Sequence, residues 1–239
     1  MTTAAKTVRE IVIENPSSTR VFEQLGIDYC CGGGKSLEQA CLNANLDIDR
    51  VVDSLEKSQA LPSSQAARDW QKESLAALIA HIENSHHKYT REELTRLALL
   101  FDKVCAVHGK KHPELSRIRE AFEDLYQELV GHMMKEEMVL FPCIKRMEAA
   151  TMANGQVAHA LFGSLQHPIA MMEHEHDSAG GALRVMRDAS NGFVAPVDAC
   201  ISFQTLYRTL AGFEADLHQH IHLENNILFP RAMAMESAS

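Results

Sequence analysis

Apolar residues recur at helical spacing over most of the chain. Near the N-terminus four short segments show this pattern: VREIVIE, STRVFEQLG, LEQACLNA and DIDRVVDSLEK, with the glycine-rich stretch DYCCGGGK between the second and the third. The stretch SQALPSSQAARD that follows lacks such periodicity and is rich in Ser, Ala and Gln, which is typical of a linker. The pattern therefore predicts a small N-terminal helical domain over residues 1–58 and a linker over residues 59–69.

Four long helical patterns follow, and they are separated by short breaks that contain Gly, Pro or Asn. They cover residues 70–108, 113–149, 167–190 and 196–234. Pro113, Pro168 and Pro196 stand at three of the predicted starts, where proline fits because its missing N–H would have no intrahelical partner. No segment shows a competing strand pattern. We predict an all-α protein whose residues 70–239 form an antiparallel four-helix bundle.

The second and fourth long patterns contain an internal repeat. HMMKEEMVLFP, from His132 to Pro142, matches HIHLENNILFP, from His220 to Pro230, at a constant offset of 88 positions. In each copy a glutamate, Glu136 or Glu224, follows the first histidine by four positions, so that the two side chains share one face of a helix. A single His-x-x-x-Glu is common on solvated helix faces, but its duplication indicates that two bundle helices present the same side chains to one place.

Four histidines are spaced evenly along the bundle. His87, His132, His176 and His220 are separated by 45, 44 and 44 positions, one from each predicted helix. In an antiparallel bundle this regularity brings them to one height, because each residue adds about 1.5 Å along a helix. Four imidazoles and two carboxylates then meet in one buried volume. This donor mixture suits two iron ions bridged by the carboxylates; zinc usually takes fewer ligands, and manganese stays open as an alternative.

Several further residues are placed outside this set. Four histidines lie beside the chosen ones but turn away from them, and we predict rim or surface positions for His86, His174, His218 and His222. His108 would lie about 31 Å from His87 along a continuous helix, too far to reach the same metals. For Glu128 and Glu175 two interpretations stay open: acids that orient imidazoles or pass iron outward, and solvated helix charges. Four methionines are predicted to fill the core: Met133, Met134, Met171 and Met172.

The six cysteines are expected to be reduced thiols, since a chain of 239 residues does not need disulfides to fold. Cys30 and Cys31 precede three glycines in a turn before a helix, where backbone amides and an accessible thiolate can coexist. Such a pair can serve metal handover, a redox thiol relay or attachment to a partner, and two incidental thiols are the alternative. The other cysteines fall in helical patterns and are predicted to be buried apolar residues: Cys41, Cys105, Cys143 and Cys200.

Charge and composition narrow the classes of partner. The net charge of −9 and a pI near 5.8 would repel phosphate backbones, which disfavours nucleic acid. No apolar stretch approaches the roughly 20 residues of a membrane span, and the first residues do not form a signal-peptide core, so we expect a cytoplasmic protein without a membrane partner. The 13 histidines support a search for metal. Self-association as a homodimer stays open.

Four motifs together resemble the repair of iron centres family, of the YtfE and ScdA type. They are DYCCGGGK at 28–35, GHMMKEEMVLFP at 131–142, EHEHDSAG at 173–180 and HIHLENNILFPRA at 220–232, and they span nearly the whole chain. In that family an N-terminal domain bearing DYCCGG is joined to a hemerythrin-like di-iron bundle. The additional glycine after the cysteine pair is a small departure that affects the loop alone.

The resemblance implies a ligand set and a function. The four histidines of the even series would be terminal iron ligands, while Glu136 and Glu224 would bridge both irons beside an oxo or hydroxo group. The implied role is the repair of iron–sulfur clusters damaged by nitric oxide or hydrogen peroxide, by donation of labile iron to the damaged proteins. Two alternatives stay open: an enzyme that reduces nitric oxide to nitrous oxide at the di-iron site with the cysteines passing electrons, and a protein that binds or senses O2 or NO reversibly.

Overall fold

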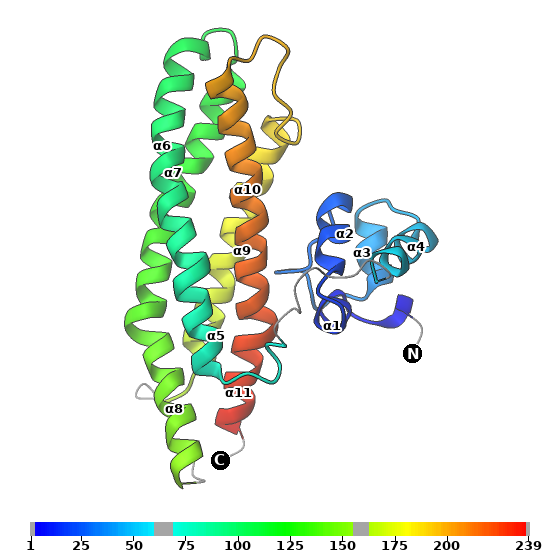
Figure 1. The fold of residues 1–239 in the computed structure, drawn as a ribbon, viewed down its shortest axis with the longest axis vertical. Helices are drawn as coiled ribbons and strands as arrows, with labels where there is room; N and C mark the ends of the chain where they lie inside the picture. The colour runs from blue at the N-terminus through cyan, green and yellow to red at the C-terminus, as the bar shows by residue number, and fades with distance from the viewer. Residues whose placement is uncertain (1–2, 60–68, 155–162, 238–239) are drawn as a thin grey trace.

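The computed structural model describes residues 3–59, 69–154 and 163–237. Within these ranges the chain is helical, and its one extended pairing is a single bridge between Thr7 and Ser36. A four-helix bundle forms the larger part, and a smaller group of helices lies beside its helix α10 (Ile201–Leu223) (Figure 1). The predicted all-α fold with a C-terminal bundle is confirmed. The predicted linker, residues 59–69, lies almost wholly outside the described ranges.

The N-terminal helices coincide with the four periodic segments. After the short turn η1 (Thr3–Ala5), the chain forms α1 (Val8–Glu14), α2 (Ser18–Leu25), α3 (Leu37–Asn43) and α4 (Ile48–Gln59). Thr7 and Glu10 form a reciprocal cap at the start of α1, which satisfies two backbone N–H groups. Gly26 ends α2 with φ +67°, a left-handed conformation that favours glycine. The helices enclose an apolar core of their own, which includes Val8, Phe22, Tyr29, Leu37 and Leu55.

The bundle consists of four rods. In chain order they are α5 (Leu75–His81), η2 (Ile82–His87) and α6 (Lys88–His108); α7 (Glu114–Lys135), η3 (Glu136–Leu140) and α8 (Phe141–Asn154); α9 (Gln166–Ala189); and α10, η4 (Glu224–Leu228) and α11 (Phe229–Ser237). Helix α7 packs on α9, and α6 packs on both α10 and α7. The segments η2, η3 and η4 are π-helical turns inside otherwise α-helical rods. Such turns are rare and concentrate at functional sites.

Two rods begin later than the periodicity predicts. The first starts at Leu75 rather than at residue 70, because Trp70 lies in a turn and stacks on His81 with ring centroids 4.5 Å apart. The fourth starts at Ile201 rather than at residue 196. Pro196 instead begins a turn in which the backbone N–H of Ala199 donates to its carbonyl at 3.0 Å. Proline at the first position of a turn and proline at the first position of a helix have the same φ, and local sequence does not separate them.

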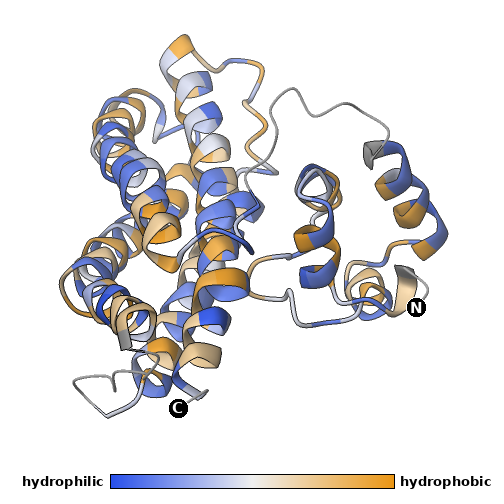
Figure 2. Cartoon of the chain, turned by 60° about the horizontal axis from the view of Figure 1, so that its bottom comes forward, coloured by the Kyte–Doolittle hydropathy of each residue, from blue (hydrophilic) through white to orange (hydrophobic). Residues whose placement is uncertain are grey.

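Buried apolar side chains divide the bundle interior into two clusters with a polar layer between them. One cluster extends from the ligand level toward the α6–α7 end and contains Leu94, Phe122, Leu183 and Phe213. The other extends toward α8 and α11 and contains Ile79, Ile144, Leu165 and Phe229. Apolar and polar residues alternate along the rods (Figure 2), and the apolar side chains of the two clusters are buried between the rods. The six candidate ligands lie in the polar layer, where only a compensated charge is tolerated.

The pseudo-symmetry of the repeat extends to the helix ends. The carboxylate of Glu148 accepts from the backbone N–H groups of Leu75 and Ala76 at 2.6 and 2.8 Å, at the start of the first rod. Glu236, which is 88 positions later, accepts from the N–H of Leu165 at 3.0 Å at the start of the third rod. A carboxylate at a helix N-terminus satisfies otherwise unpaired donors. Each half of the bundle is therefore closed in the same way, which fixes the register of neighbouring rods.

None of the described helices combines the length and the apolar character that crossing a membrane requires.

Candidate metal centre

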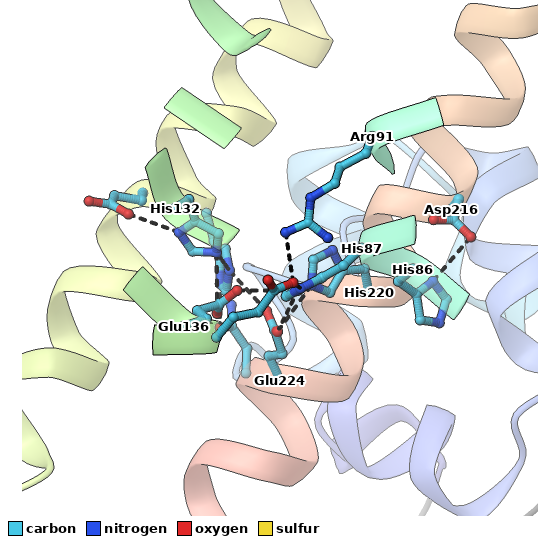
Figure 3. Close-up of polar contacts among 12 residues, drawn as sticks. His86, His87, Arg91, His132, Glu136, Asp216, His220 and Glu224 are labelled. Carbon is cyan, nitrogen blue, oxygen red and sulfur yellow. Dashed lines mark hydrogen bonds and ion pairs between the residues drawn. The ribbon is translucent and has the colours of Figure 1, made fainter. Parts of the chain in front are cut away.

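The structure brings the six predicted ligand residues together in the polar layer of the bundle (Figure 3). His87 ends η2, His132 and His220 lie one turn before the ends of α7 and α10, and His176 lies in α9. The two glutamates begin the π-helical turns η3 and η4. All six residues are between 0% and 2% exposed: His87, His132, Glu136, His176, His220 and Glu224. Their assignment as metal ligands stays a prediction.

The histidines form two pairs. The Nε2 atoms of His87 and His220 are 3.1 Å apart, and those of His132 and His176 are 3.0 Å apart. In each pair the two rings meet edge to face, with centroids 4.8 and 4.7 Å apart. The pairs come from adjacent rods in each case, α5–α6 with α10 and α7 with α9. Two nitrogen atoms therefore point into each of two neighbouring volumes.

Glu136 faces both histidine pairs. Its Oε2 lies 3.3 Å from Nε2 of His87, and its Oε1 lies 3.3 Å from Nε2 of His132. The carboxylate thus directs one oxygen atom toward each pair. The position of Glu136 at the start of a π-helical turn, one turn after His132, places it between the rods instead of on the face of one rod.

Glu224 repeats this arrangement from the opposite rod. Its Oε1 lies 3.0 Å from Nε2 of His220, and its Oε2 lies 3.1 Å from Nε2 of His176. Two groups of ligand atoms result, each within 4.8 Å of one another: one is His87, Glu136, His220 and Glu224, and the other is His132, Glu136, His176 and Glu224. Each group has two imidazoles of its own, and the two groups share both carboxylates. This is the donor sharing that a dinuclear centre requires.

Carboxylate oxygens without hydrogen-bond partners at this site are suited to binding cations. Both oxygens of Glu136 and Oε2 of Glu224 have no hydrogen-bond partner within the described part of the chain, although both side chains are fully buried. A buried carboxylate without compensation costs several kcal/mol, and here two of them face each other. Imidazole and carboxylate are ligands that iron accepts. The donor set and its burial are therefore compatible with iron.

Both carboxylates are anions in this environment. Burial raises the pKa of Glu224, but the facing His220 and His176 lower it more, and the pKa lies well below its usual value. The pKa of Glu136 is likewise lowered by His132 and His87 against the effect of burial. Burial lowers the pKa of His132, while the carboxylate of Glu136 raises it to about 9. Without metal, a proton on this imidazole supplies part of the positive charge that the carboxylates need.

Outer hydrogen bonds orient three of the four imidazoles. The Nδ1 atom of His87 donates to Glu137 at 2.7 Å, and that of His132 donates to Glu175 at 2.8 Å. When each ring carries a single hydrogen, as a metal ligand must, these acceptors hold it on Nδ1 and leave the Nε2 lone pair directed into the centre. The two acids are themselves held by cations. Arg91 donates to Glu137, and Lys135 donates to Glu175.

His176 is oriented by a residue that the sequence analysis did not single out. Its Nδ1 donates to the side-chain oxygen of Asn225 at 2.8 Å. Asn225 and Glu137 directly follow the two bridging candidates and are 88 positions apart, so the repeat offset was the available signal for both. Glu175, for which two interpretations stayed open, is the residue that orients His132. Glu128 is exposed and accepts from Ser178 at 2.9 Å, as a solvated helix charge would.

The fourth imidazole is held differently. Nδ1 of His220 is buried and has no hydrogen-bond partner among the residues that the structure describes. Instead the ring stacks on His86 at 5.7 Å with an interplanar angle of 10°. The prediction of a rim or surface position for His86 is wrong: its side chain is buried and its Nδ1 contacts Asp216 at 3.1 Å. His86 faces α10, which carries both Asp216 and His220, so a residue one position before a candidate ligand is still covered by a neighbouring rod.

The three other histidines predicted at rim or surface positions divide between buried and exposed places, and His108 lies elsewhere. His222 is also buried, against the prediction, because the N-terminal helices cover its face of α10; its ring lies 5.7 Å from that of Tyr29. Burial and the nearby Arg9 lower the pKa of His222 to about 4, which keeps the ring neutral. His174 is exposed as predicted, and His218 is half-buried at the same domain contact. His108 lies away from the centre, where its Nε2 contacts the sulfur of Cys200 at 3.1 Å.

The methionines and isolated cysteines divide between core and surface. Met133 and Met172 are buried, while Met134 and Met171 are exposed, so the prediction of core positions is wrong for the latter two. Of the isolated cysteines, two are buried, Cys41 and Cys143. Cys105 is half-buried and Cys200 is exposed, so the prediction of buried positions is wrong for both; Cys200 is the extended N-cap residue of α10 and does not lie within the helix.

Cys30 and Cys31 lie at the contact between the N-terminal helices and the bundle. Their sulfur atoms are 3.9 Å apart, and Asp28 accepts from both backbone N–H groups at 3.1 and 3.0 Å. The two thiols line a cavity of 550 Å³ together with Arg184 and His218 of the bundle. The thiol of Cys31 and burial raise the pKa of Cys30 well above its usual value. Cys30 is thus a buried neutral thiol, and the more accessible sulfur is that of Cys31.

Two family models and several known proteins match this chain. Residues 4–59 match the ScdA_N model, described as a domain of unknown function (DUF542), and residues 78–232 match the hemerythrin HHE cation binding domain. The iron-sulfur cluster repair protein YtfE of Pectobacterium atrosepticum is 41% identical over 227 residues, which cover 95% of this chain and 96% of the relative. A probable iron-sulfur cluster repair protein of Haemophilus influenzae is 36% identical over 233 residues, with 98% and 99% covered. YtfE of Yersinia pseudotuberculosis is 38% identical over 226 residues, with 95% and 96% covered.

Proposed function

Since the chain belongs to the family of iron–sulfur cluster repair proteins that join an ScdA_N domain to a hemerythrin HHE domain, we propose that it repairs damaged iron–sulfur clusters by donating iron. The damage is nitrosative or oxidative, and the recipients are proteins that have lost iron from their clusters. The relatives are named for cluster repair, which favours donation over nitric oxide reduction and over reversible binding of O2 or NO.

One observation carries the proposal: two buried carboxylates each direct one oxygen toward each of two histidine pairs. In the proposed loaded state Glu136 and Glu224 bridge two iron ions, and each ion also takes two imidazoles. The pairs are His87 with His220, and His132 with His176. Four protein ligands per ion leave room for an oxo or hydroxo bridge, which completes the proposed centre. Bound in this way, iron is the cargo of the protein.

The same residues give a physical reason for release. Carboxylates exchange between bridging and terminal binding more readily than a rigid thiolate cage, so a centre held by two of them can lose an ion. The outer acids lie partly at the surface, since the side chains of Glu137 and Glu175 are 28% and 27% exposed. Water can therefore compete for the hydrogen bonds that orient His87 and His132.

The N-terminal domain adds the thiol pair. We propose that Cys30 and Cys31 act as a thiol relay near the centre and that residues 1–58 and 70–239 are two domains joined by the linker 59–69. The cavity that the two sulfurs line is also lined by α9 and α10, which bear ligands. The proposal places the protein in the cytoplasm together with its recipients.

Transfer of labelled iron tests the function. Protein loaded with ⁵⁷Fe is mixed, without oxygen, with a cluster enzyme that nitric oxide has inactivated, and recipient activity and ⁵⁷Fe content are both measured. We expect both to rise together. Glu128→Gln is the matched control, because it removes an exposed carboxylate one turn before His132 and should transfer iron normally. Recovery of activity without ⁵⁷Fe in the recipient would contradict donation, and nitrous oxide formation in the same vessel would favour the reductase.

A further inference from the structure

One side chain connects the N-terminal domain to the turn that carries Glu224. Asn226 lies in η4, is 3% exposed, and donates its amide hydrogens to the carbonyl of Tyr29 at 3.0 Å and to Nδ1 of His222 at 2.9 Å. Its side-chain oxygen accepts from Nε of Arg9 at 2.5 Å. Arg9 and Tyr29 belong to the N-terminal domain. Both ends of this amide are thus used at the contact between the domains.

The loop around the cysteine pair is shaped to this contact. Gly33 lies so close that an added Cβ would be 2.8 Å from the carbonyl of Tyr29 and 3.1 Å from the side-chain oxygen of Asn226. The carbonyl of Gly33 accepts from the backbone N–H of Arg9 at 2.8 Å, which places the guanidinium. Cys30 follows Tyr29 directly and is buried here. When the domains separate, the amide of Asn226 and the thiol of Cys30 become exposed together.

Asn226 is close in sequence to two groups that build the centre. It follows Asn225, whose side chain orients His176, and it is two residues after Glu224. All three belong to one π-helical turn of five residues. A π-helical turn is an uncommon conformation that needs support from its surroundings. A shift of this turn would move the bridging carboxylate and the outer hydrogen bond of His176 at once.

The half of the bundle that contains η3 has different outer contacts at the equivalent positions. The residue 88 positions before Asn226 is Met138, which is 74% exposed. On that side the imidazoles are oriented by Glu137 and Glu175, each held by a cation. On the η4 side His176 has only the neutral Asn225, and Nδ1 of His220 has no partner among the described residues. The η4 half therefore lacks charged outer bonds and has the docked domain in their place.

We propose that Asn226 is a positioning residue through which docking of the N-terminal domain holds iron in the centre. Docking fixes the η4 turn, and undocking lets Glu224 and Asn225 move and weakens the binding of iron. The inference rests on iron binding at the proposed centre. Coupling between two equilibria is reciprocal, so bound iron must strengthen docking by the factor by which docking strengthens iron binding.

Two rates report the coupling, and both are measured on the full chain. One is the loss of iron from the loaded protein to an excess of ferrous chelator. The other is the alkylation of Cys30 by iodoacetamide, read by mass spectrometry, with buried Cys143 of the bundle as the internal reference for general unfolding. Arg9→Ala breaks the contact from the N-terminal side and leaves the bundle sequence intact. We expect iron loss and Cys30 alkylation each to become about tenfold faster, the effect of losing one buried hydrogen bond.

The remaining variants separate positioning from general stability. Arg9→Lys keeps a donor for Asn226 and should restore most of the slow iron loss, while Asn226→Ala should behave like Arg9→Ala. Met138→Ala changes the equivalent position of the other half and should change neither rate. In the parent protein, iron loading should slow Cys30 alkylation by about the same factor of ten, with alkylation of Cys143 unchanged.

Each result decides a separate point. Unchanged iron loss in Arg9→Ala overturns the inference, whether or not Cys30 becomes reactive. Equal alkylation of Cys30 in the iron-free and iron-loaded parent also overturns it, because reciprocity then fails. Failure of the proposed function has a different signature: the parent either binds no iron at the centre or releases iron that never reaches a recipient.

Discussion

Replacement of Glu224 by glutamine tests the sharing of carboxylates most directly. The side chain is fully buried, and its two oxygens face different histidine pairs, at 3.0 Å from His220 and 3.1 Å from His176. Glutamine has the same shape and keeps one carbonyl oxygen, but it loses the charge. A bridging ligand serves both ions, whereas a histidine serves one. Glu224→Gln should therefore weaken both sites, and His176→Ala should weaken one.

The size of the effect is set by the charge that the substitution removes. Two unit charges about 3 Å apart attract each other by about 5 kcal/mol at an effective dielectric constant of about 20. Loss of this attraction corresponds to between three and four decades of affinity, since about 1.4 kcal/mol is tenfold. The retained amide oxygen returns a part of it. We expect the iron content of Glu224→Gln to fall from two per chain to below one after gel filtration.

The assay combines iron content with Mössbauer spectroscopy on ⁵⁷Fe-loaded protein. In the parent two coupled irons are expected, in His176→Ala one iron, and in Glu224→Gln little bound iron in either position. Glu128→Gln is the control for charge, since it removes an exposed carboxylate one turn before His132. Two tightly held irons in Glu224→Gln, or loss of one iron alone as in His176→Ala, would refute the bridging role.

Three further predictions concern the surroundings of the centre. Asn225→Leu removes the acceptor of His176 and should lower iron affinity by about 10- to 100-fold with little change in fold; unchanged affinity in an equilibrium competition with a chelator would contradict the orienting role. The pKa of His132 is about 9 in the metal-free protein, above its ordinary value of 6.5, so this imidazole is protonated at neutral pH and iron must displace the proton. Iron affinity should then rise by about tenfold per pH unit up to pH 9. The stabilisation that the proton gives to the metal-free fold is present below pH 6.5 and is lost as the pH rises through 9. Calorimetry in buffers of different ionisation enthalpy measures the number of protons released on iron binding, and a value of zero at pH 7 would contradict the raised pKa of His132. Phe141 is buried and stacks on His87 at 5.7 Å, so Phe141→Ala should lower the free energy of unfolding by about 3–5 kcal/mol and also loosen iron, in contrast to the exposed Leu99→Ala, which should do neither in urea denaturation.

The two halves of the bundle have equivalent candidate ligands but different hydrogen-bond partners around them. The repeat supplies His132 with Glu136 and His220 with Glu224, and both glutamates begin π-helical turns. Outside the ligands the halves diverge at the position that follows each glutamate, where one has Glu137 and the other Asn225. The imidazoles of the first half therefore donate to carboxylates, whereas in the second half His176 donates to a neutral amide and the ring of His220 stacks on His86.

Local pattern predicted the helices, apart from the starts of two rods, and it predicted that the six candidate ligands meet. Each N-terminal helix coincides with one periodic segment, and the even spacing of the histidines predicts their common height because every helical residue adds the same rise. The repeat offset of 88 positions also contains Glu137 and Asn225, although their contacts with His87 and His176 could not be read from it. Spacing gives the height of a side chain and its face, and these two quantities select the candidate ligands.

Other features depend on what lies across from a residue. His86 and His222 are buried, contrary to prediction, because a second rod covers the former and the N-terminal helices cover the latter. The wide turns at Glu136 and Glu224, the pairing of histidines between particular rods and the use of Asn226 by the N-terminal domain likewise follow from packing. Periodicity along one helix contains no information about its neighbours. The sequence by itself therefore determined which residues meet, and the tertiary structure decided how they are paired, supported and enclosed.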